Sequence, residues 1–334
     1  MSISNSNRRF RSPFNRALIA YSIRDGFWLF VSCFVALLLM SWARGWAVST
    51  VNTESFQTIL DALPREIQKL FPVDYAWLVT YTGRVAMTYE EPIIFLCLAI
   101  WCVARSSDCV SGQLGRGTLE MLLAQPVSRL QVLATHSAIT VAGIVLLSLA
   151  SWLGLFAVIQ NTSVKEEVTV KIGIPHTPFQ FPLPYSKKEV ITPLSEKVNE
   201  HALWAGTVNF GCTGLMLAGL TTMLSALDRY RWRTIGLVTG FYIVQTLMVI
   251  LSMLTDTLKW LSWFSIFSAY KPSASISVAD QRPHELWQFF IISSTSGEQI
   301  LGPLAFNLIL ISIAVLSYAI AAIIFQRRDL PAPV

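Results

Sequence analysis

Charged side chains are scarce in this sequence and are missing altogether from long stretches of it. Asp, Glu, Lys and Arg make up 13% of the 334 residues, against 53% apolar residues, and the mean hydropathy is +0.53. A soluble globular protein does not carry uncharged apolar blocks of this length, because one core could not bury them. The composition therefore predicts a polytopic membrane protein.

Cysteine is missing from the two large segments that we expect outside the membrane. The five cysteines all lie in the apolar blocks or on their cytoplasmic side: Cys33, Cys97, Cys102, Cys109 and Cys212. This distribution argues against a disulfide framework. No histidine or acidic residue completes a metal-ligand set with them, so we expect them to pack among apolar side chains.

Motifs of nucleotide binding and hydrolysis are missing as well. The chain contains no G-x-x-x-x-G-K-[ST] phosphate loop, no H-E-x-x-H and no G-x-S-x-G. We therefore expect no catalytic residue, no cofactor and no metal ion on this chain.

The uncharged blocks predict an all-α fold with six transmembrane helices. The expected spans are residues 26–43, 90–110, 130–160, 201–227, 234–255 and 300–326. The uncharged part of the second span, Pro92 to Ala104, reaches only about 20 Å as a helix, against a hydrocarbon core of roughly 30 Å. It must continue to about Val110, and we expect Arg105 and Asp108 to reach toward the headgroups at its inner end.

The basic residues predict that both termini are cytoplasmic. In that orientation the inner segments hold 13 basic and 5 acidic residues, whereas the outer segments hold 12 and 15, as the positive-inside rule requires. The formal charge of +5 and the pI near 9.0 follow from this placement, so we expect the lipid bilayer of the plasma (inner) membrane as partner and no nucleic acid.

Three further segments have their own patterns. Residues 13–25 carry apolar side chains at helical spacing and form either an amphipathic interfacial helix or the entry to the first span. The extracytoplasmic loop 161–200 combines an alternating, β-branched stretch with prolines, which predicts strands. Trp260 to Tyr270 is uncharged but too short to cross, so it is either a re-entrant helix or one lying flat on the interface.

The segment between the second and third spans predicts a short cytoplasmic helix. Gly115 and Gly117 permit a tight turn, Thr118 can cap a helix, and Pro126 ends it. Ser128 then starts the next helix with a capping box. The short helix would present leucines beside polar side chains, which suits docking in a groove of another protein, or it would only cover the inner membrane surface.

The run GTLEMLLAQPVSR, from Gly117 to Arg129, closely resembles a segment of ABC-2 type transporter permeases, the membrane subunits of ATP-binding-cassette exporters. The resemblance implies that residues 117–125 are a coupling helix seated on a separate ABC ATPase subunit, which binds ATP and Mg²⁺. It further implies a second permease copy or a paralogue. The coupling residues implied are Gly117, Thr118, Leu119, Glu120, Leu122, Leu123, Gln125, Pro126 and Arg129, with Glu120 and Arg129 as the polar contacts.

Other functions remain open at this stage. An ion-coupled secondary transporter usually needs a carboxylate or a broken helix at the midplane, and the six blocks lack such a carboxylate. A membrane-embedded enzyme needs a nucleophile with a base, and His136 has no obvious partner. A transport-inactive membrane component of a larger complex is the third alternative.

Overall fold

The computed structural model describes residues 16–51, 56–58, 62, 64, 73–173, 180–292 and 299–328. Helices make up most of the described residues. Within the described residues, six helical runs are long and apolar enough to cross a membrane. This confirms the predicted all-α polytopic fold.

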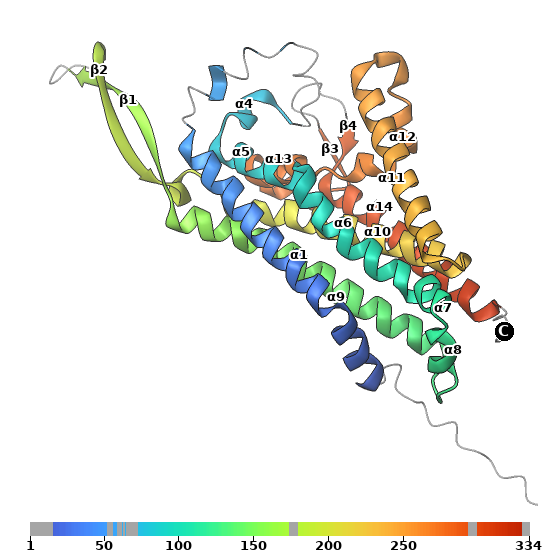
Figure 1. Ribbon diagram of the computed structural model, residues 1–334. Helices are drawn as coiled ribbons and strands as arrows, with labels where there is room; N and C mark the ends of the chain where they lie inside the picture. The colour runs from blue at the N-terminus through green and yellow to red at the C-terminus, as the bar shows by residue number, and fades with distance from the viewer. Residues whose placement is uncertain are drawn as a thin grey trace, which may run out of the picture.

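Each of the six runs overlaps one of the six expected spans, and the runs lie side by side in one bundle (Figure 1). They are α1 (Arg16–Thr50), the run Tyr81–Gly115, α9 (Arg129–Asn161), α10 (Leu203–Leu227), α11 (Arg231–Leu254) and α14 (Pro303–Arg327). The second run joins α5 (Tyr81–Ala86), the 3-10 helix η1 (Met87–Glu90), α6 (Pro92–Ser107), the π-helix η2 (Asp108–Gly112) and α7 (Gln113–Gly115). It therefore continues past Val110, as the short uncharged block required.

The first helix does not divide into an interfacial part and a spanning part. α1 runs without a break from Arg16 to Thr50, so residues 16–25 are the beginning of the same helix; residues 13–15 lie outside the described residues. The polar side chains of this stretch find partners within the bundle, because Arg105 donates to Asp25 Oδ2 at 3.0 Å and to Ser22 Oγ at 2.6 Å. Arg105 is therefore buried and does not extend to the headgroups as expected.

Small residues allow close packing between the spans. On the contact between α1 and α9, the hydroxyls of Ser41 and Ser151 lie 2.9 Å apart, and a Cβ added to Gly154 would lie 2.4 Å from the carbonyl oxygen of Leu38. Without a hydrophobic force between helices in lipid, such close backbone approach supplies much of the association energy.

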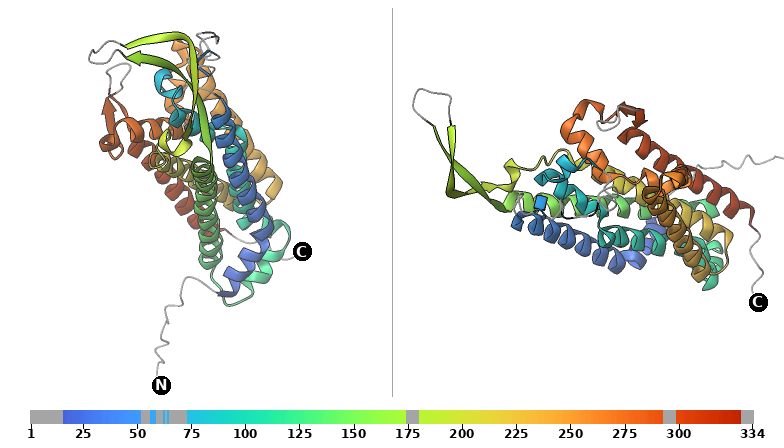
Figure 2. Two further views of the ribbon diagram at one scale, coloured as in Figure 1. Left: turned by 90° about the vertical axis from the view of Figure 1, so that its left-hand side faces the viewer. Right: turned by 90° about the horizontal axis from the view of Figure 1, so that it is seen from above.

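A β-hairpin projects from the end of the bundle opposite α8 (Thr118–Leu123) (Figure 2). Its strands are β1 (Ser163–Gly173) and β2 (Gln180–Pro193), which pair antiparallel with a register shift between Thr169 and Lys171. The 3-10 helix η3 (Leu194–Glu196) connects the hairpin to α10. The strands expected within residues 161–200 are thus present.

The chain between the fifth and sixth spans folds back toward the bundle as a series of short elements. They are η4 (Asp256–Leu258), α12 (Leu261–Phe264), η5 (Ile266–Ala269), α13 (Pro272–Gln281), η6 (Pro283–Glu285), and the antiparallel strands β3 (Phe290–Ile292) and β4 (Gln299–Leu301). A further short helix, α4 (Tyr75–Leu78), precedes α5.

The uncharged segment Trp260–Tyr270 returns along α11 instead of lying across its end. Ser265 Oγ donates to the carbonyl of Gln245 at 3.1 Å, and the Ile266 N–H donates to Gln245 Oε1 at 2.9 Å. Gln245 lies nine residues before the end of α11, a rise of about 14 Å. The segment therefore folds back beside α11, and it is built from α12 and η5 rather than from one helix.

Candidate functional site

The short helix between the second and third spans is α8, Thr118–Leu123. It lies at the end of the bundle where α1 begins and α14 ends (Figure 1). Gly117, with φ of 71°, is its N-cap, a conformation that favours glycine. Thr118 is therefore the first helical residue and not the expected cap, and its hydroxyl donates to the Gln113 carbonyl at 3.2 Å. The helix ends before Pro126, as predicted.

One face of α8 holds it on the bundle. Leu119 is completely buried in an apolar cluster that also contains Leu114, Leu133 and Phe325. Leu123 packs partly against the same cluster. Leu119 and Leu123, expected to enter a groove of another protein, thus contact the protein's own spans.

The opposite face of α8 is open. Met121 is 72% exposed, and Ala124, Gln125 and Pro126 are exposed as well. Glu120 and Leu122 are half-buried, and Leu122 lines a cavity of about 20 Å³ against the start of α1. Met121 was not among the coupling residues expected from the sequence. A helix of less than two turns is too short for the spacing of its apolar residues to show which of its faces is buried.

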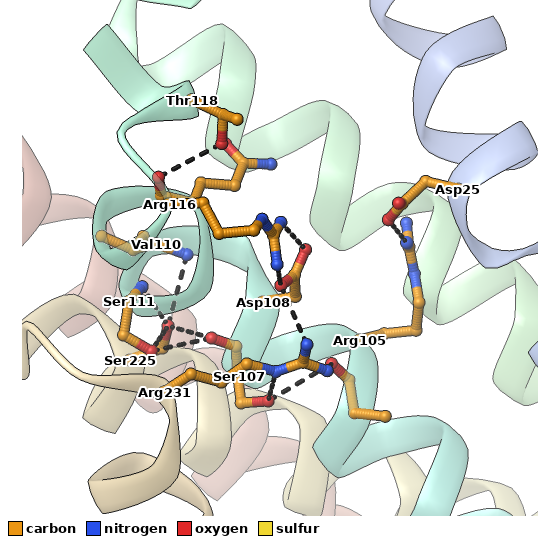
Figure 3. Close-up of polar contacts among 12 residues, drawn as sticks. Asp25, Arg105, Ser107, Asp108, Val110, Ser111, Arg116, Thr118, Ser225 and Arg231 are labelled. Atoms are coloured by element: carbon orange, nitrogen blue, oxygen red, sulfur yellow. Dashed lines mark hydrogen bonds and ion pairs between the residues drawn. The ribbon is translucent and has the colours of Figure 1, made fainter.

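A buried aspartate connects α8 to the second and fifth spans (Figure 3). Arg116, in the turn before α8, donates to both carboxylate oxygens of Asp108 at 2.7 and 2.9 Å. Arg231, the first residue of α11, approaches the same carboxylate at 3.3 Å. The hydrogen bonds from Arg116 to Asp108 raise the pKa of Arg116, so this cation stays charged. The three side chains form what we call the Asp108 cluster.

Asp108 opens the π-helix η2, whose wide turn brings its carboxylate next to Gly112. A Cβ added to Gly112 would lie 2.2 Å from Asp108 Oδ1, so the turn requires glycine there. Single π turns inside α-helices are common at functional sites.

Side chains of α10 and α11 satisfy the backbone groups of this turn. Ser225 Oγ accepts from the N–H groups of Val110 at 3.2 Å and Ser111 at 2.9 Å, and donates to the Ser107 carbonyl at 3.0 Å. Arg231 donates to the Ala104 carbonyl at 3.1 Å. The π turn is thus fixed to its neighbours by directed contacts as well as by packing.

Arg129 follows α8 and binds the end of the last span. Its guanidinium donates to the carbonyls of Phe325 at 3.3 Å and Arg328 at 2.5 Å. A cation suits this position, because the last carbonyls of a helix carry partial negative charge and lack intrahelical partners. The predicted capping box of Ser128 and Gln131 is present beside it. Arg129, expected as a contact to an ATPase, therefore joins the start of α9 to the end of α14.

The geometry of the site suits a mechanical role. Among the described residues, no three His, Cys, Asp or Glu side chains lie close enough to hold a metal ion. What the site offers is a short exposed helix fixed to several spans at once. It can receive force from a partner and pass it into the membrane.

A comparison with models of protein families identifies the family of this chain. The model of the ABC-2 family transporter proteins matches residues 19–330, which is nearly the whole chain. The chain belongs to the ABC-2 transporter family. This ABC-2 family protein is a membrane-embedded permease of an ABC transporter, a transport component and not a catalytic subunit. No curated protein matches it in sequence.

Proposed function

We propose that this permease forms the translocation path of an exporter driven by ATP hydrolysis on a separate ABC ATPase subunit. Family membership supports an ATPase partner, and the chain carries no phosphate loop of its own. ATP and Mg²⁺ bind the ATPase. A second permease copy or a paralogue completes the path. The uncharged middle parts of the spans suit an amphiphilic or apolar substrate.

The ATPase contacts α8 and the turns on either side of it. The exposed side chains Met121 and Gln125 make the contact, together with the half-buried Glu120. Leu119 and Arg129 orient the helix without reaching the partner. The single observation that carries the proposal is that α8 has an open face while its other face is fixed to the bundle.

Movement of α8 is transmitted to the spans through the Asp108 cluster. Arg116 lies two residues before α8, Asp108 belongs to the second span, and Arg231 begins the fifth. Because the carboxylate binds both guanidiniums, a shift of α8 pulls on both spans together. The α8 end is cytoplasmic, with both termini, which agrees with its many arginines.

Substitution of Met121 tests the contact with the ATPase. Met121→Asp places a charge on the open face of α8, and co-purification of the ATPase with the permease should fall at least about tenfold. The melting temperature should not change, because Met121 is exposed. Ile191→Asp, at an exposed apolar position on β2, is the matched control and should retain the ATPase.

ATP-driven transport into inverted vesicles separates this function from the alternatives. Wild-type complex should transport and Met121→Asp complex should not. An ATPase that remains bound to the Met121→Asp variant would refute the assignment of the contact. Transport by the permease alone under a pH gradient would refute the ATP-driven mechanism, and cysteine labelling at Gln125 from outside the cell would refute the orientation.

A further inference from the structure

Several hollows lie along the seam between α6 and α11, and three of them follow one another toward the α8 end. The largest, about 540 Å³, is lined almost wholly by apolar side chains such as Ile100, Val103 and Val238. A second, about 450 Å³, and a third, about 140 Å³, both include Arg116 and Arg231.

The hollows are contiguous because they share lining residues. Ile235 borders the first and the second, and Ala104 borders the first and the third. Together they form a groove that is apolar along the spans and basic at the α8 end. We call it the seam groove.

The seam groove exists because α11 is loosely packed and its neighbours are small. Only 17% of the spanning window of α11 is buried inside the protein, against 67% for α10. Gly112 and Gly115 line the basic end, and a Cβ added to Gly115 would come no closer than 3.7 Å to the Arg229 carbonyl. The space is therefore open at the surface of the bundle.

The basic end of the groove carries an excess of positive charge. Asp108 is one carboxylate between two guanidiniums, those of Arg116 and Arg231. Each guanidinium has five N–H donors, and the contacts to described residues use two of those on Arg116 and three of those on Arg231. Both side chains are close to half exposed. Donors and charge are thus available to an anionic group without opening the Asp108 cluster.

Two aromatic residues mark this level as the membrane interface. Trp232 and Tyr230 border the same hollow as Arg231, and they are 72% and 48% exposed. Trp and Tyr gather where headgroups meet hydrocarbon, because each ring has an apolar body and a polar edge.

We propose that the seam groove binds an anionic glycerophospholipid of the leaflet at the α8 end. An acyl chain lies between α6 and α11, and the phosphate accepts hydrogen bonds from Arg116 and Arg231. Arginine suits this role, since its planar fork of donors matches phosphate oxygens, and basic pockets between spans are recognised lipid sites. The lipid is a resident partner, so the proposal is independent of the substrate that the permease moves.

The headgroup half of the proposal is tested by lipid retention. The full permease with its ATPase is purified from vesicles that hold equal amounts of dioleoyl phosphatidylglycerol and dioleoyl phosphatidylethanolamine. The bound lipid is then identified and quantified by native mass spectrometry. Phosphatidylglycerol should be enriched about tenfold. Arg231→Gln should abolish the enrichment, whereas Arg231→Lys should keep part of it. Arg233→Gln removes a charge at the same end outside the groove and should have no effect.

The acyl-chain half is tested by filling the groove. Thr239 is exposed on α11 and lines the apolar hollow, so Thr239→Trp should remove bound lipid without disturbing the core. Leu237→Trp, exposed on the same helix but outside the hollow, should retain it.

Three results would overturn the proposal. Equal retention of both lipids, or an equal loss of phosphatidylglycerol enrichment in Arg231→Gln and Arg233→Gln, would show that lipids are attracted to the basic surface in general and not to the seam groove. Displacement of the lipid by glycerol 3-phosphate in the wild type, with no effect of Thr239→Trp, would reveal a simple anion site. Unchanged retention in Thr239→Trp alone would show that no lipid chain occupies the groove, as when a second permease copy covers it.

Discussion

At the two ends of the bundle, α8 and the segment Trp260–Tyr270 are held by different kinds of contact. At the α8 end, charged groups meet in the Asp108 cluster, and Arg129 binds the last carbonyls of α14. At the opposite end, Asn209 holds the end of the segment Trp260–Tyr270 through neutral groups. Its amide donates to the Ala269 carbonyl at 3.1 Å and accepts from the Lys271 backbone N–H at 3.0 Å.

The kind of contact, charged or neutral, suits the surroundings of each segment. Charge pairs near water act over several ångströms and tolerate small shifts in distance, so they can hold a helix that moves with a partner. Neutral hydrogen bonds are lost within a fraction of an ångström and need a fixed geometry. We therefore expect the α8 end to move as a connected unit and the opposite end to stay closed until its hydrogen bonds break together.

The largest effect should come from Asp108→Asn, which leaves two guanidiniums without their carboxylate. The free energy of unfolding should fall by about 3 kcal/mol, at the lower limit for a buried ion pair because Arg116 and Arg231 are partly exposed. Hydrogen exchange should speed up in residues 113–123 and stay unchanged in residues 261–271. Glu91→Gln removes a pair with Arg44 in which both partners, unlike Asp108, are partly exposed, and it should cost less than 1 kcal/mol. Equal losses in the two variants would contradict the importance of the cluster.

Asn209→Ala should have a smaller effect, at the other end. Asn209 is fully buried, and its removal leaves the Ala269 carbonyl and the Lys271 N–H without a partner, at a cost of about 2 kcal/mol. Hydrogen exchange should now speed up in residues 266–271 and not in α8. If both ends loosened together, they would be one cooperative unit and the comparison would fail. Ser268→Ala, which loses only a local bond to the Ser265 carbonyl, serves as the control.

Arg129→Gln should have the smallest effect. It weakens a half-buried contact with the end of α14, worth about 1 kcal/mol. ATPase co-purification should be retained, because Arg129 orients α8 without reaching the partner; its loss would show that Arg129 contacts the ATPase, as the sequence suggested. Arg327→Gln, an exposed neighbour in the last turn of α14, is the control and should change the melting temperature by less than the Arg129 variant does.

The spans could be predicted from the sequence because one free-energy cost, that of placing a charge in the bilayer core, determines where they lie. A charge in the bilayer core is expensive enough that an uncharged block of about 20 residues identifies a spanning helix without any knowledge of its neighbours. The helix after Gly117 and its end before Pro126 could also be predicted, since turn and stop signals are local.

Contacts between distant residues could not be predicted in this way. The first turns of α1 contact Arg105, some 80 residues from its partners Asp25 and Ser22, and without knowledge of that contact the amphipathic pattern fits an interfacial helix equally well. The partner of Arg129 lies almost 200 residues away. Likewise, Leu119 and Met121 are both apolar, and only the packing of the other spans determines which of them is buried.

The π turn at Asp108–Gly112 has a consequence for the direction in which Met121 faces. Such a turn already holds about one residue more than an α-helical turn, so one further inserted residue would not be absorbed there and would swing α8 by about 100° about the axis of α6. Leu119 would then leave its apolar cluster, and Met121 would face another direction. The docking direction of α8 is therefore set by the number of residues in the turn before it, and a single inserted residue would misdirect the helix while leaving its own sequence intact.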